Sequence, residues 1–139
     1  MSHAHRRPAL VLGLLLAGAS VAPAAPGDPP PHDLQAMAEA RYRAALNQFE
    51  ESWTYYRQAR SDPFLVYAWS RLVLESQRDL SDEKANQVAA LEAHRERMER
   101  LEKLVKKVRR LGFGRSIEVG AVNYYLLEAE YWIAQAKSS

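Results

Sequence analysis

The longest regular pattern of apolar and polar residues runs from Ser81 to Leu111. Apolar residues recur there at intervals of three and four within a run of Glu, Lys, Arg and Gln, which predicts one long amphipathic helix. A narrower series steps alternately by three and four, as in a coiled-coil seam: Leu91, His94, Met98, Leu101, Val105 and Val108. A helix of this length would span about 46 Å, so we expect an elongated shape in which a partner helix covers the seam.

Two further helices are predicted before this segment. The first begins after Asp33, a good N-cap, and ends near Arg60. Its apolar stripe consists of Ala38, Tyr42, Leu46, Phe49, Trp53 and Tyr56. The second begins at Asp62-Pro63, because Asp caps helices well and Pro favours the first helical position. Its stripe consists of Val66, Trp69, Val73 and Leu80.

The ends of the last two helices also carry signals. Ser81 is the expected cap of the third helix, with Asp82 and Glu83 in its first turn. Gly112-Phe113-Gly114 should end that helix, and Ser116 should cap a fourth that runs to about residue 137. The stripe of the fourth helix consists of Val119, Val122, Leu126, Ala129 and Ile133. No segment alternates with period two, so we predict no strands.

The two halves of the chain repeat this pattern. A shift of 52 residues aligns the stripes of the first and third helices, and a shift of 53 aligns those of the second and fourth. We therefore predict an all-α fold of two tandem long helical hairpins, residues 34–80 and 82–137, within one helical domain, residues 34–137. The four helices should form either a coiled-coil-like structure or an elongated four-helix bundle.

The N-terminus has the features of a secretory signal peptide. Arg6 and Arg7 precede an apolar run that ends at Ala22, and small residues follow. We expect residues 1–24 to be the signal, cleaved after Ala24. The alternative is a retained membrane anchor, but about 14 apolar residues are fewer than the roughly 20 that a spanning helix needs. Residues 25–33 contain four prolines and are expected to form an extended linker. The mature chain should have no stable membrane span and should be periplasmic or envelope-associated.

Composition narrows the functional classes. The chain has 19 Lys and Arg against 17 Asp and Glu, and loss of Arg6 and Arg7 with the signal leaves a formally neutral protein. Its overall charge therefore argues against nucleic-acid binding. Because there is no Cys, an exported chain of this kind must be stable without disulfides.

The sequence offers few candidates for catalytic or metal-binding residues. After the signal, the only histidines are His32 and His94, and His94 lies on the seam of the third helix, where we expect it to be half-buried at an interface. A di-iron site in a bundle would need Glu-x-x-His on two helices, and neither copy exists. The sequence also lacks a Ser/His/acid or phosphate-loop pattern. We expect no catalytic residues, no metal site and no cofactor, and hence a non-enzymatic protein.

The segment from Gly112 to Ala136 carries a family resemblance. A Gly-containing turn precedes an acidic-Val pair and a helix rich in Ala and Leu, in Gly112, Gly114, Glu118, Val119, Ala121, Leu127, Ala129 and Glu130. This pattern resembles the hairpin repeat of TolC-like outer-membrane efflux proteins. The rest of the chain matches only through the internal repeat, Gly120 stands where Leu is usual, and the barrel strands are missing. The resemblance implies a helical hairpin and an envelope setting, but not a channel.

A weaker resemblance gives an alternative. The segment from Leu80 to Lys84 is similar to the Leu-Thr-x-x-Gln motif of the periplasmic Spy and CpxP proteins, although Lys84 replaces the Gln and no second copy appears. That resemblance implies a periplasmic chaperone or metal-stress adaptor.

The helices carry more apolar residues than one narrow seam uses. Tyr124 and Tyr125 are adjacent and cannot both face the same seam, so one of them is a candidate for an exposed contact. Our candidate helix-contact residues are Leu101, Val105, Tyr124, Tyr125, Leu127 and Trp132. We expect an exported structural or interaction protein of the bacterial cell envelope, whose partner is itself or another helical envelope protein.

Overall fold

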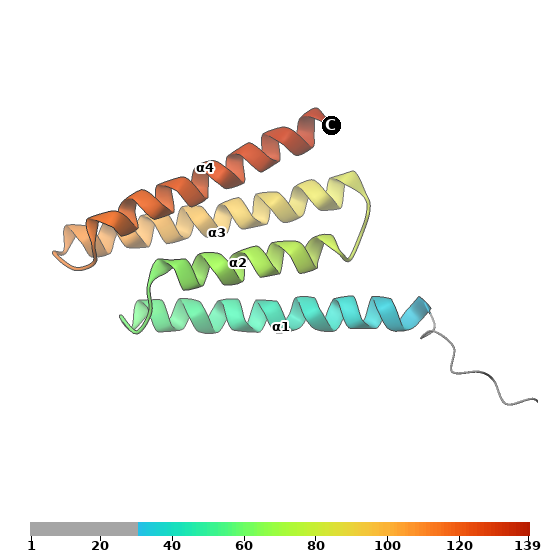
Figure 1. Ribbon diagram of the computed structural model, residues 1–139, viewed down its shortest axis with the longest axis horizontal. Coiled ribbons are helices and arrows are strands. Elements are labelled where there is room, and N and C mark those ends of the chain that lie inside the picture. Colours follow the sequence, from blue (N-terminus) through green and yellow to red (C-terminus); the bar gives the residue numbers. More distant parts are fainter. Residues whose placement is uncertain (1–30) are drawn as a thin grey trace, which may run out of the picture.

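A computed structural model describes residues 31–139, which form four helices and, over that range, no strand (Figure 1). The helices are α1 (Pro31–Arg57), α2 (Pro63–Arg78), α3 (Lys84–Arg110) and α4 (Ser116–Ser138). The prediction of an all-α fold with four helices is confirmed. The expected signal peptide and most of the expected linker lie outside the described residues.

The helices lie in chain order as an open stack. α1 packs along α2 and α3 packs along α4, so each half of the chain is a helical hairpin, and α2 joins the two hairpins by packing on α3. Figure 1 shows α1 and α4 at the two edges of the stack. The repeat in the sequence has a structural counterpart, because α3 begins 53 residues after α1 and α4 begins 53 residues after α2.

The seam of α3 lies at the centre of the core. Leu91, His94, Met98, Leu101 and Val105 are all buried, as the alternating spacing predicts. Met98, Leu101 and Val105 pack with buried side chains of the other three helices, which include Phe49, Trp53, Val66, Val73, Val122 and Tyr125. A second, smaller cluster contains Leu74, Ala90, Leu91 and Ile133. Burial of these side chains supplies the main driving force for packing the hairpins together.

The start of α2 follows the prediction, but the start of α1 does not. The Asp62 carboxylate accepts a hydrogen bond of 3.3 Å from the backbone N–H of Leu65, and Pro63 is the first helical residue. α1 begins at Pro31 rather than Leu34, so Asp33 lies inside the helix and is not its cap. A proline at the first helical position loses no hydrogen bond, which explains why the helix extends into the expected linker.

The prediction for the start of α3 is also corrected. The helix begins at Lys84, so Asp82 and Glu83 precede it and Ser81 is not its cap. The Ser81 hydroxyl instead accepts hydrogen bonds from the backbone N–H of Glu83 at 3.2 Å and from the side-chain amide of Asn86 at 2.9 Å. Ser thus stabilises the turn before the helix, an alternative that short polar side chains offer.

Candidate functional site

The fourth helix is positioned by a turn and a side-chain cap. Gly112 and Gly114 adopt positive φ angles of 86° and 71°, which glycine tolerates without a steric penalty. The Glu118 carboxylate then accepts hydrogen bonds of 3.0 Å from both the backbone N–H and the Nε of Arg115. The predicted break is confirmed, but Arg115 occupies the cap position, and Ser116 is the first residue of α4.

One face of α4 belongs to the core. Val122, Tyr125, Ala129 and Ile133 are buried along it. The Tyr125 ring stacks on Tyr67 of α2, with ring centroids 3.8 Å apart and planes inclined by 9°. These contacts hold α4 against both α2 and α3 and leave its opposite face directed to solvent.

The opposite face of α4 carries a second seam, which we call the α4 outer seam. Its members step alternately by three and four: Ile117, Gly120, Tyr124, Leu127, Tyr131 and Ala134. The four large side chains among them expose between 56% and 73% of their surface, and no member is charged. Such spacing is typical of a coiled-coil contact, so α4 has one seam buried in the core and one seam without a partner in the described chain.

Five of the six candidate helix-contact residues fall into two groups. Leu101, Val105 and Tyr125 lie in the core of the chain itself, with 0%, 2% and 9% of their surface exposed. Tyr124 and Leu127 lie on the α4 outer seam.

The remaining candidate, Trp132, is half-buried, and the guanidinium of Arg71 lies 4.7 Å from its ring centroid. Ile117 and Tyr131 also lie on the α4 outer seam but were not among the candidates from the sequence, although extending the spacing from Tyr124 and Leu127 in both directions identifies them.

A hydrogen-bonded carboxylate connects the α4 outer seam to the core. The Tyr67 hydroxyl donates to Glu128 Oε1 at 2.6 Å, and the Tyr124 hydroxyl donates to Oε2 of the same residue at 3.3 Å. Burial and the bond to Glu128 raise the pKa of Tyr67, so its hydroxyl stays protonated and remains a donor at neutral pH. The hydrogen bond to Glu128 therefore restrains the exposed Tyr124 ring.

A buried polar cluster joins α2 to α3. The Ser70 hydroxyl lies 2.8 Å from Nδ1 of His94 and accepts a hydrogen bond of 2.8 Å from Nε of Arg97. His94 is fully buried, which corrects the expectation of a half-buried residue. Burial, together with the positive charges of Arg97 and Arg71, lowers the pKa of His94 to about 3, so its imidazole is neutral at physiological pH.

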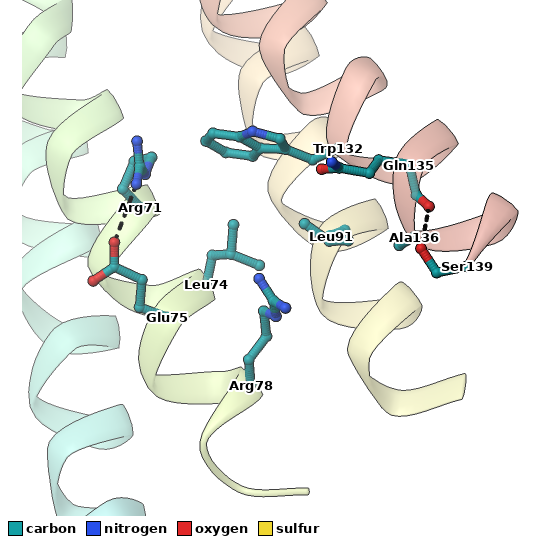
Figure 2. Close-up of a pocket in the computed structure, with 9 residues that line it drawn as sticks. All are labelled: Arg71, Leu74, Glu75, Arg78, Leu91, Trp132, Gln135, Ala136 and Ser139. Carbon is teal, nitrogen blue, oxygen red and sulfur yellow. Dashed lines mark hydrogen bonds and ion pairs between the residues drawn. The ribbon is translucent and has the colours of Figure 1, made fainter. Parts of the chain in front are cut away.

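A groove of about 450 Å³ lies between α2 and α4 (Figure 2). Arg71 and Arg78 of α2 line it, with Trp132 of α4 and a floor that includes Leu74 and Leu91. The Arg71 guanidinium is already paired with Glu75 at 3.2 Å, and Figure 2 shows it directed toward the Trp132 ring. These internal partners make the arginine part of the packing between α2 and α4.

Two further findings concern metals and membranes. Within residues 31–139, no three His, Asp or Glu side chains are grouped so that they could hold a metal ion. Among the four helices described, none has the length and apolar character needed to cross a lipid bilayer.

Among the described residues, the α4 outer seam is a regular apolar surface that packing within the chain does not explain. Its exposed aromatic and aliphatic side chains can bury apolar surface against a partner. Its role has to be argued from this geometry, because comparison of the chain with known protein families, characterised proteins and solved structures finds no match.

Proposed function

We propose that this protein is an exported, non-enzymatic interaction protein of the bacterial cell envelope, which binds a helical partner through the α4 outer seam. The observation that carries the proposal is a run of uncharged residues at coiled-coil spacing on the exposed face of a helix whose other face is already buried. A partner helix is the element that such spacing accommodates, because its side chains fit between successive turns of the seam.

The size of the exposed surface supports this proposal. Large aromatic side chains present roughly 150 to 250 Å² each when exposed. Two tyrosines, one isoleucine and one leucine that are more than half exposed therefore present on the order of 500 Å² of surface along one helix. A soluble monomer seldom exposes a larger contiguous apolar patch, and patches of this size are often binding sites.

The proposed location in the cell envelope is inferred from the sequence. The basic, apolar and small-residue series at the N-terminus is typical of a signal peptide, and the turn and helix from Gly112 to Ala136 resemble the hairpins of TolC-like envelope proteins. The arrangement of the described residues as two hairpins is compatible with that resemblance.

The geometry around His94 favours this proposal over a metal-stress adaptor. A metal sensor would need an accessible imidazole, because the ion and its water molecules have to reach the ligand. His94 has no exposed surface, and its Nδ1 already lies within hydrogen-bond distance of Ser70. The α4 outer seam, in contrast, is accessible along its whole length.

Site-specific photo-crosslinking in living cells tests the proposal. A photoreactive amino acid replaces Leu127 on the α4 outer seam, and the matched control carries it at Asn47 on the exposed face of α1. We expect a defined crosslinked product in the envelope fraction from the Leu127 variant and none from the Asn47 variant. Equal labelling at both positions, or no product at Leu127, would contradict the proposal.

A further inference from the structure

The two edges of the helical stack differ in chemistry. Between Glu39 and Thr54, every exposed residue of α1 is charged, polar or alanine, and the exposed large apolar side chains of this helix, Leu34, Met37 and Tyr55, lie outside that stretch. Glu39 also pairs with Arg43 at 3.5 Å on that face. At the opposite edge, the α4 outer seam presents four large apolar side chains and no charge. α1 therefore resembles the polar terminal unit of a repeat structure, whereas α4 resembles an internal unit whose neighbour is missing.

Comparison of α2 with α4 shows what kind of neighbour this face accepts. With the offset of 53 residues between the two helices, Tyr67, Arg71 and Leu74 of α2 occupy the positions of Gly120, Tyr124 and Leu127 in the α4 outer seam.

These three residues of α2 contact the second hairpin. Tyr67 stacks on Tyr125, the Arg71 guanidinium covers the Trp132 ring, and Leu74 packs in the cluster that contains Ile133. The face that receives a helical hairpin in the first half of the chain is thus the face that is left open in the second half.

We propose that a second copy of this chain covers the open face, with the two α4 outer seams packed antiparallel about a twofold axis. This inference rests on the proposed function, since it names the partner of the same surface. A head-to-tail arrangement would place the polar face of α1 against the apolar seam and leave charges without partners. A twofold contact pairs the seam with itself, and it closes after two copies.

The order of residues along the seam fits the antiparallel arrangement. Antiparallel packing aligns large with smaller residues in successive layers: Tyr124 with Leu127, Gly120 with Tyr131, and Ile117 with Ala134. A parallel arrangement would instead place each tyrosine against its own copy and leave a gap at the paired glycines. Since a Cβ built on Gly120 would meet no atom within 4 Å, this position has room for a Tyr131 side chain from the second copy.

The flanking charges and the buried area are consistent with a dimer. In the antiparallel alignment Glu130 lies beside Asn123 of the second copy and Glu128 lies beside Ala121, so no like charges meet. Two seams together remove roughly 1,000 Å² of surface from water, which is at the lower end for specific interfaces. We therefore expect a reversible dimer with a dissociation constant in the micromolar range.

Sedimentation of the mature protein from micromolar to millimolar concentration measures this association. Wild type should shift from monomer to dimer, and a Leu127→Glu, Tyr131→Glu double variant should dimerise at least about 100-fold more weakly, because two charges would be buried in each seam. An Asn47→Glu variant on α1 is the matched control and should dimerise like wild type. Circular dichroism must show unchanged helix content in both variants. If the double variant misfolds, the single Leu127→Glu variant is used in its place.

The orientation is tested by cysteine crosslinking, which is straightforward because the chain has no natural cysteine. A mixture of the I117C and A134C proteins should form a disulfide-linked dimer on mild oxidation, whereas each protein alone should form little. Efficient linkage of each protein with itself would show a parallel dimer and overturn the proposed orientation.

The outcomes separate this inference from the proposed function. A monomer at every concentration, combined with a photo-crosslink from Leu127 to a different protein, would overturn the dimer and leave the proposed function supported. A dimer that is unaffected by the double variant would show that another surface mediates association and would also overturn this inference. A monomer without any crosslink at Leu127 would overturn both.

Discussion

Leu101 and Val105 have 0% and 2% of their surface exposed, and both lie on the seam of α3 that packs in the core. Leu101→Ala or Val105→Ala should lower the free energy of unfolding by roughly 2 to 4 kcal/mol, because each change removes buried methyl groups and leaves a cavity. Lys107→Ala, at an exposed position of the same helix, should change it by less than about 0.5 kcal/mol. Chemical denaturation measures all three, and equally small effects would mean that α3 packs through a different face.

The buried imidazole of His94 should make stability depend on pH. Its pKa in the folded chain is about 3, below the ordinary value of 6.5, so only the unfolded chain takes up a proton as the pH falls below about 6.5. The stabilisation is fully present above that pH, and this one group should remove up to about 1.4 kcal/mol per pH unit below it.

A His94→Gln variant isolates this effect, because it has the same Asp and Glu residues as the wild type. The free energy of unfolding, measured between about pH 7 and pH 4, should fall more steeply in wild type than in the variant. Parallel curves for the two proteins would show that His94 is not the group responsible. The groups that face it come from its own helix and from two neighbouring helices: Arg97 from α3, Tyr67, Ser70 and Arg71 from α2, and Trp132 from α4.

At the scale of residues, periodicity predicts which side of a helix is buried but not how polar groups are satisfied. The spacing along α3 identified Leu101 and Val105 as seam residues, and both are buried. It could not predict the full burial of His94, because the hydroxyl that bonds the imidazole comes from Ser70, 24 residues earlier and on another helix. Likewise, it showed that Tyr124 and Tyr125 face different sides, and only the packing on α2 decides that Tyr125 is inside.

At the scale of helices, two glycines near the start of α4 should respond in opposite directions to substitution by alanine. Gly112 has a φ of 86°, which an alanine adopts only with strain, so Gly112→Ala should destabilise by about 1 kcal/mol. Gly120 lies within α4 with open space around its Cα, so Gly120→Ala should stabilise by up to about 1 kcal/mol through its higher helix propensity. Thermal unfolding of the monomer compares them, and a shift in the same direction for both would contradict the backbone assignment.

A helix start was predicted well where an N-cap residue is followed directly by proline. Asp62 and Pro63 each favour the same helix start, and α2 begins there with the expected cap. Asp33 and Ser81 have no proline after them, and in both cases the helix begins two or three residues away. Because short polar side chains stabilise turns as readily as helix ends, a single such residue does not locate a boundary.

At the scale of the whole molecule, the internal repeat was enough to predict two hairpins but not how they pack. The pattern of each helix left open whether the hairpins stay extended or close into a bundle. The stacking of Tyr67 on Tyr125 and the burial of α3 between α2 and α4 settle this as an open stack in chain order. Contacts of this kind depend on side chains more than 50 residues apart, which no local pattern encodes.

The proposal of export makes a prediction about the mature chain. We expect cleavage after Ala24, because Ala22 and Ala24 are the small residues that signal peptidases accept and the preceding apolar run is too short to span a membrane. Mass spectrometry of the protein isolated from an envelope fraction should find Ala25 at the N-terminus. Recovery of the intact N-terminus from that fraction would contradict cleavage.

The Ser70 hydroxyl, which bonds both His94 and Arg97, also contributes to the register between the two hairpins. Apolar seams of similar residues could slide past each other by one helical turn, about 5.4 Å, and still bury much the same surface. Such a slip would move both polar groups of α3 away from Ser70 and leave a buried imidazole and a guanidinium without that oxygen. The apolar side chains hold the hairpins together but would tolerate several alignments. This small polar cluster favours one of these alignments.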